Sequence, residues 1–191
     1  MINKNKKNEQ GFVLPLALLV LVVMSIMAAT LVTITSKDHA ANNSKDSGQQ
    51  AFYAAESGIT VAKKWMIDNT NMLTGSPNVL DGNLRFCKAN LFPNLNQSHG
   101  FGPAKENLNK YISASGNEAT RLSKFSFEYF ITYSPDKYGN VPSNKSSAKK
   151  KEGTSQVYYT IYSCGCNQEK NTCNTEKDII IPLEAVVTLV E

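Results

Sequence analysis

The stretch from Phe12 to Thr35, FVLPLALLVLVVMSIMAATLVTIT, decides how the rest of the chain is arranged. Its 24 residues carry no charged side chain. As an α-helix the stretch would be ~36 Å long at ~1.5 Å per residue, whereas the hydrocarbon core of a bilayer is ~30 Å thick. It therefore predicts one membrane-spanning helix with some tilt.

The residues before this stretch, MINKNKKNEQG, are polar, carry lysines and end in Gly11 where the apolar run begins. A secretory signal instead has a shorter apolar region of ~7–15 residues, followed by its cleavage site. Cleavage after Gly11 would therefore keep the apolar helix in the mature protein. Pro15 would then be the fourth residue, where a missing N–H costs little, although transmembrane helices also tolerate proline elsewhere.

The charge balance does not favour nucleic acid as a partner. The net charge is +4, and the leader supplies half of it, so cleavage after Gly11 would leave about +2. Three leader lysines face only Lys37 and Lys45 beyond the apolar stretch, which favours a cytoplasmic N-terminus. Residues 134–153 contain five lysines and no apolar periodicity, and we expect an exposed loop there.

The chain continues as a helix beyond the membrane segment, to about Asp68. Apolar side chains recur there at spacings of three and four, the period of one helix face. This stripe consists of Phe52, Ala55, Ile59, Ala62 and Met66. We expect the amphipathic extension, residues 36–68, to pack the stripe on a soluble domain, residues 69–191. One helix from Phe12 to about Asp68 is the simplest arrangement, and two helices joined near residues 41–48 are the alternative.

The soluble domain is expected to be α+β, with the long helix packed on a small, mainly antiparallel sheet. Residues 125–133 alternate between large apolar and mostly polar side chains, which predicts a strand with one strongly buried face. Residues 157–162 predict a second strand, and residues 179–190 predict one more, or two if Pro182 breaks the ladder. Residues 69–124 predict an irregular connection with a helical turn near residues 105–112.

Four cysteines lie beyond the membrane segment, at Cys87, Cys164, Cys166 and Cys173. In an oxidising compartment they predict two disulfides, for which three pairings exist. Cys164 and Cys166 are too close in sequence to pair easily, and we favour Cys166–Cys173 with Cys87–Cys164. The cluster could also suggest a thiolate metal site, but it holds only three sulfurs, so disulfides are favoured over a metal.

The sequence offers no catalytic signature. It lacks a nucleophile elbow, a phosphate loop and the H-E-x-x-H pattern. His39 and His99 have no neighbours in sequence that suggest a ligand set or a catalytic pair, and we expect surface roles for both. The chain is therefore not expected to be an enzyme or to bind a cofactor.

The N-terminal region resembles that of a known family. The lysine-bearing leader, Gly11–Phe12 and the apolar helix resemble a class III prepilin signal. The segment GFVLPLALLVLVVMSIM, followed by QQAFYAAESGI at Gln49–Ile59, is similar to the start of the PilX-type minor pilins of type IV pili. The resemblance covers residues 9–65 and implies a type IV pilin-like fold. It also implies that a prepilin peptidase cuts between Gly11 and Phe12 and methylates the new amine of Phe12.

The resemblance further implies a location, a role and partners. The chain would wait in the inner membrane as a single-pass protein with a cytoplasmic N-terminus and a periplasmic head. An inner-membrane assembly platform would then draw it from the lipid into a pilus at the cell surface. Its partners would be the major pilin and other minor pilins, and its role would be to initiate pilus assembly, within a tip or priming complex.

One position departs from the common pilin pattern. Most pilins have a glutamate as the fifth residue after cleavage, and this chain has Leu16. A subunit without that glutamate resembles the tip pseudopilin of type II secretion, which favours a place at the filament tip; the alternative is that Leu16 is simply tolerated. Two other functions stay open, a minor pseudopilin of type II secretion and a single-pass membrane protein with a periplasmic binding domain.

Substitution at Gly11 tests the predicted processing. The peptidase must fit extended backbone at the junction of leader and helix, where Gly11 is the small residue. The variant Gly11→Val should therefore leave full-length protein in the membrane, visible as a slower band on an immunoblot. Finding Met1 on the mature protein from pili would contradict the assignment.

Overall fold

The computed structural model describes residues 13–74, 77–79, 84–93, 95, 99–112 and 114–189. The chain divides into two compact units, one ending at Lys45 and one beginning at Asp46. Helix α1 (Val13–Asp68) is a single helix, as the simplest arrangement predicted, and no break occurs near residues 41–48. Its residues 46–68 belong to the second unit, and the architecture below is that of this unit.

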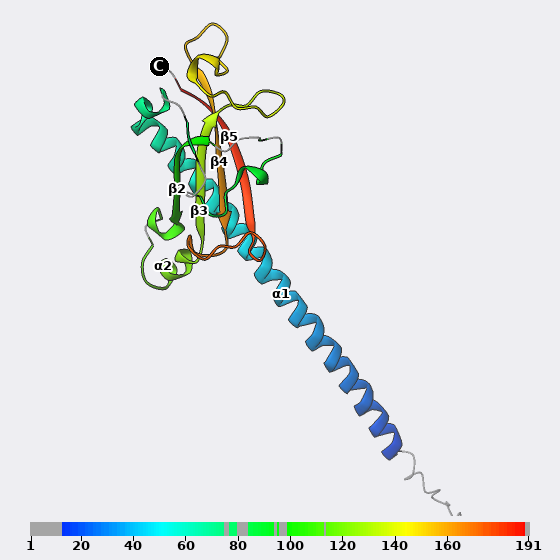
Figure 1. Cartoon of the computed structure of the whole chain (residues 1–191). Coiled ribbons are helices and arrows are strands. Elements are labelled where there is room, and N and C mark those ends of the chain that lie inside the picture. The colour runs from blue at the N-terminus through cyan, green and yellow to red at the C-terminus, as the bar shows by residue number, and fades with distance from the viewer. Residues whose placement is uncertain are drawn as a thin grey trace, which may run out of the picture. The chain divides into compact units, whose positions relative to one another are not determined.

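The second unit is built on an antiparallel sheet with the strand order β1-β2-β3-β4-β5. Figure 1 shows the strands from β2 to β5 side by side. The strands are β1 (Asn78–Val79), β2 (His99–Asn107), β3 (Ser126–Tyr133), β4 (Val157–Cys166) and β5 (Ile180–Leu189). A short helix, α2 (Gly116–Ser123), and the 3-10 turns η1 (Thr70–Thr74), η2 (Ala89–Leu91), η3 (Leu108–Lys110) and η4 (Lys145–Ser147) connect them. The predicted α+β layout, a long N-terminal helix with a small antiparallel sheet, is confirmed.

The sequence predicts an irregular connection with short elements over residues 69–124, and it gives no specific signal for strand β2 or helix α2. The sequence of β2, HGFGPAKEN, lacks clean alternation because it contains a bulge. Between the pairs Phe101–Ile131 and Ala104–Tyr129, β2 advances by three positions and β3 by only two. Gly102 sits in this bulge with φ 52°, a conformation that favours glycine, and the ring of Trp65 from α1 lies against it.

Strand β4 is longer than predicted, and β5 confirms the first of the two predicted alternatives, a single strand. β4 runs on from Tyr162 to Cys166, and β5 is one strand that passes through Pro182 without a break. Pro182 is accommodated because β5 is the last strand of the sheet, where proline is tolerated.

The face of α1 that packs on the sheet lies slightly away from the predicted stripe. Its buried residues in the second unit are Ala51, Ala54, Ala55, Gly58, Ala62 and Met66. Ala55, Ala62 and Met66 are therefore placed as expected, and Ile59 packs partly against the core. Phe52 is 40% exposed, and its assignment to the stripe was wrong. The large ring does not fit where helix and strand approach closely, and small side chains occupy that seam instead.

The close approach joins α1 to β4. A Cβ on Gly165 would fall on the backbone carbonyl of Ala51 and lie 2.6 Å from the amide nitrogen of Ala55. The Ser163 hydroxyl donates a hydrogen bond of 2.8 Å to the Ala55 carbonyl, and both groups are buried. A Cβ on Gly58 would in turn meet that serine hydroxyl. Small residues on both elements thus set how near the helix lies to the sheet.

The sheet has a hydrophobic cluster on each face. On the α1 face, Phe127, Tyr129 and Ile131 of β3 pack with Ala62 and Met66. The other cluster contains Phe130 and Tyr162 from the strands and Phe86 and Phe92 from the segment 84–93. Every residue of β3 is consequently buried. The sequence predicted a single buried face because the segment that covers the second face lies far away in the chain.

A methyl group at position 165 tests the seam. Gly165→Ala should lower the free energy of unfolding by about 1–3 kcal/mol, because the added Cβ meets backbone that cannot move aside locally. Gly48→Ala is the matched control, since nothing lies within 4 Å of its Cβ position and alanine favours a helix by about 0.5–1 kcal/mol. Denaturant unfolding of the full chain in detergent, followed by Trp65 fluorescence, measures both. Equal stability of the two variants would contradict the described contact.

Candidate assembly surface

The apolar part of α1 has the length and composition of a membrane-spanning helix. Every side chain from Val13 to Lys45 is exposed, and α1 is long and apolar enough to cross a bilayer. Its hydroxyl groups bond to carbonyls of the same helix, as Ser25 does to Leu21 at 2.8 Å and Thr30 to Met27 at 2.8 Å. Such bonds satisfy polar groups that lipid could not. The segment is compatible with a single-pass membrane anchor.

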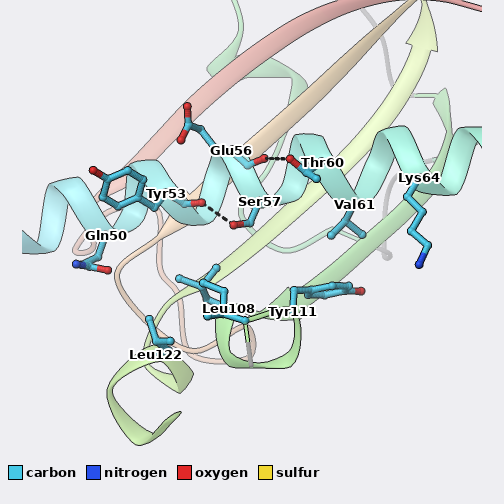
Figure 2. A pocket seen from close by; sticks show the side chains of 11 residues that line it. Gln50, Tyr53, Glu56, Ser57, Thr60, Val61, Lys64, Leu108, Tyr111 and Leu122 are labelled. Atoms are coloured by element: carbon cyan, nitrogen blue, oxygen red, sulfur yellow. Dashed lines mark hydrogen bonds between the residues drawn. The ribbon is translucent and has the colours of Figure 1, made fainter. Parts of the chain in front are cut away.

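A groove of about 590 Å³ lies in the second unit, between one flank of α1 and the connection from β2 to α2 (Figure 2). Gln50, Tyr53, Ser57, Val61 and Lys64 follow one another along the helix wall, as Figure 2 shows. The facing wall is formed by Leu108 of η3, Leu122 of α2, and Tyr111 and Ile112 between them. The groove therefore follows α1 for about four turns.

The groove is suited to an apolar partner surface. The Ser57 hydroxyl donates to the Tyr53 carbonyl at 2.9 Å, and the Thr60 hydroxyl donates to the Glu56 carbonyl at 3.1 Å (Figure 2). These hydroxyls are thus used within the helix and do not call for a polar ligand. Tyr111 and Ile112 remain 46% and 41% exposed, although both are large and apolar. Exposed apolar surface gathered in a hollow is typical of a protein–protein contact.

The sequence did not reveal this groove. The helix wall is the flank beside the predicted stripe, and the facing wall belongs to η3 and α2, in the region predicted to be irregular. The expected helical turn at residues 105–112 does overlap η3. Its contact with α1, however, depends on how β1 and β2, which separate the two elements in the sequence, join the sheet. A row of Gln50, Tyr53, Ser57 and Lys64 at spacings of three, four and seven is the signal that could have marked the helix side.

The four cysteines form Cys87–Cys164 and Cys166–Cys173, the pairing favoured from the sequence. The ligand atoms of Cys166, Cys173 and Asp178 lie within 4.8 Å of one another, as in a small metal site. The two sulfurs are bonded to each other, however, and a metal would need them as thiolates. The Asp178 carboxylate accepts a hydrogen bond of 2.7 Å from the backbone N–H of Asn174, which belongs to the same turn.

The remaining residues that the sequence singled out do not gather into a site. Gly11 and Phe12, the predicted processing positions, lie outside the described residues. His39 is exposed on α1, and His99 is half-buried in β2 opposite Val79. The lysine-rich loop 134–153 is largely exposed, as expected, and contains the turn η4.

Comparison with family models, with curated proteins and with solved structures finds no match to this chain. Its assignment therefore depends on the long apolar helix, on the sequence resemblance and on the fold of the second unit.

The cysteine chemistry can be tested directly. The protein purified under non-reducing conditions should release no free thiol on denaturation and should contain no stoichiometric zinc, because all four sulfurs are consumed in disulfides. Thiol titration and elemental analysis measure the two quantities. One bound zinc per chain, accompanied by free thiols, would show that the cluster is a metal site.

Proposed function

We propose that this chain is a minor pilin of a type IV pilus that takes part in starting pilus assembly, within a tip or priming complex. The observation that carries the proposal is α1 itself, which combines an exposed, uncharged membrane segment with a stretch that packs on a small antiparallel sheet. The sequence resemblance at Gly11–Phe12 and at residues 49–59 supports the same assignment. The role is structural and requires no catalytic residue.

Physically, assembly by such a chain exchanges one apolar environment for another. The side chains from Val13 to Thr35 lie in lipid before assembly and among other apolar helices afterwards. Because lipid and helices are about equally apolar, the exchange is decided by packing and by the polar contacts between subunits. The groove beside α1 supplies such a packing surface in the head, with Tyr53, Tyr111 and Ile112 available to a neighbouring subunit.

Leu16 supports a terminal position in the filament. An unpaired charge in a water-free core is costly, so the amine of one subunit and the carboxylate of another are best placed as a pair. This chain brings the amine of Phe12 but no carboxylate at position 16. A subunit that offers an amine but no carboxylate can pair with a neighbour on one side only. Such a subunit is better placed at the end of a filament than repeated through the shaft, where each copy would leave one amine unpaired.

Leu16 also favours a second candidate, a minor pseudopilin of type II secretion, which would use the same helix and groove. A single-pass membrane protein with a periplasmic binding domain is the candidate from another class. Loss of the gene separates these candidates, because it would sharply reduce the number of pili in the first case, block secretion in the second and change neither in the third.

Loss of the gene should sharply reduce the number of pili and leave assembled shafts of normal width. The reason is that a starting complex is needed once per filament, whereas a shaft subunit is needed throughout. Electron microscopy of the deletion strain measures number and width, and immunogold labelling of the complemented strain locates the chain. Gold spaced evenly along whole filaments would contradict the terminal position.

A charge in the groove tests its use in assembly. Complementation with Ile112→Glu should restore several-fold fewer pili than the wild-type chain, because a charged group would be buried at a mainly apolar contact. Met72→Glu is the control, since Met72 is also an exposed apolar side chain, 62% exposed, and does not line the groove. Equal pilus numbers with both variants, at equal protein levels, would exclude the groove as an assembly surface.

A further inference from the structure

A buried carboxylate binds three consecutive backbone amides on the second face of the sheet. Glu128 of β3 is fully buried. Its Oε2 accepts hydrogen bonds from the amides of Arg85, Phe86 and Cys87 at 2.9, 2.8 and 2.9 Å, and its Oε1 accepts a second bond from Arg85 at 2.9 Å. Burial raises the pKa of Glu128, and the three amide donors act in the opposite direction.

The strand register places this carboxylate beside one particular cysteine. Glu128 pairs with Cys164 across the β3–β4 ladder, while Cys166 pairs with Ser126 two positions further along. Cys164 is bonded to Cys87, whose own amide is held by Glu128. The carboxylate and the disulfide thus hold the same residue from neighbouring positions of the sheet.

In the reduced chain Cys87 can pair with Cys164 or with Cys166, and the length of the loop that is closed does not decide between them. Side chains two positions apart on a strand share a face, so Cys164 and Cys166 are presented together, about 7 Å apart. The disulfides observed span 7 and 77 residues. Exchanging Cys164 and Cys166 would change each of these separations by only two. Loop-closure entropy depends on the logarithm of loop length and barely distinguishes the two pairings.

We propose that Glu128 selects the partner of Cys87. By holding the amides of residues 85–87 opposite Cys164, its carboxylate brings the sulfur of Cys87 to Cys164 and keeps it from Cys166. The consequence reaches beyond the sulfurs, because Phe86 and Phe92 of the same segment cover Phe130 and Tyr162. A bond from Cys87 to Cys166 would displace this cover along β4 by two residues.

The chemistry is thiol–disulfide exchange, with glutathione disulfide as the oxidant in the test. Cys87 thiolate attacks that disulfide, forms a mixed disulfide and releases one glutathione thiolate. A strand cysteine then attacks the Cys87 sulfur and releases the second glutathione. The two protein thiols lose two electrons and two protons, and one glutathione disulfide becomes two glutathione thiols. Glu128 takes no part in electron transfer and acts as a positioning residue.

The test gives Cys87 an open choice between the two strand cysteines. In a Cys173→Ser background, the full chain is reduced, unfolded and refolded in detergent with a glutathione redox buffer. Free thiols are then alkylated, and tandem mass spectrometry distinguishes Cys87–Cys164 from Cys87–Cys166 by cleavage on either side of Gly165. We expect Cys87–Cys164 to dominate, and Glu128→Gln to lower the ratio of the two products about tenfold, because the charge-assisted hydrogen bonds are lost.

Two further variants make the result specific. Thr132→Val removes another buried polar group from β3 and should leave the ratio unchanged. Glu128→Asp withdraws the carboxylate by one methylene, disturbs the fold less and should lower the ratio several-fold. An unchanged ratio in Glu128→Asp, or in a Glu128→Gln protein with native Trp65 fluorescence, overturns the proposal. A shift in Thr132→Val as large as that in Glu128→Gln overturns it too, since general loss of stability would then explain the pairing.

Discussion

The contact of α1 with β4 is the constraint on which the second unit depends. Gly165 admits the backbone of Ala51 and Ala55, and the Ser163 hydroxyl bonds to the Ala55 carbonyl. With the helix held this close, Ala62 and Met66 reach the aromatic side chains of β3. The same placement turns the neighbouring flank of α1 towards η3 and α2, so the groove is a consequence of the seam.

The second face of the sheet is covered by chain without regular strands, and it depends on covalent and polar anchors. The Cys87–Cys164 disulfide and the Glu128 carboxylate fix one end of the segment 84–93. Phe92 packs edge-on to Phe130 and Tyr162, with ring centroids 6.0 and 4.7 Å away. The ring contacts of Phe92 therefore add to the stability of a segment that the disulfide and the carboxylate already hold in place. A short segment of this kind buries too little surface to hold its place alone.

Features with a strong local signal could be predicted from the sequence, whereas features formed by distant partners could not. The charge-free run, the alternation in β3 and the spacing of the cysteines each depend on neighbouring residues. The bulge at Gly102 hides the alternation of β2, and no local pattern marks Glu128 as the partner of amides about forty residues earlier. The predicted stripe on α1 included Phe52, whereas the neighbouring Ala51 is the buried residue. Hydrophobicity alone favours the larger side chain, but the contact with β4 admits only small ones. The groove exists only where its two walls meet in the fold. The wall formed by η3 and α2 comes after β2 in the chain, far from α1 in sequence.

One part of α1 is apolar enough to anchor in a membrane, and the other part packs on the sheet of a folded head. This combination is the physical basis of the pilin proposal. The measurement that tests it most directly is quantitative peptide mass spectrometry of sheared, purified filaments beside the membrane fraction of the same cells. The account predicts this chain in the filaments, at few copies per filament, with methylated Phe12 as its first residue. A chain found only in the membrane fraction, or one that retains Met1, would contradict it.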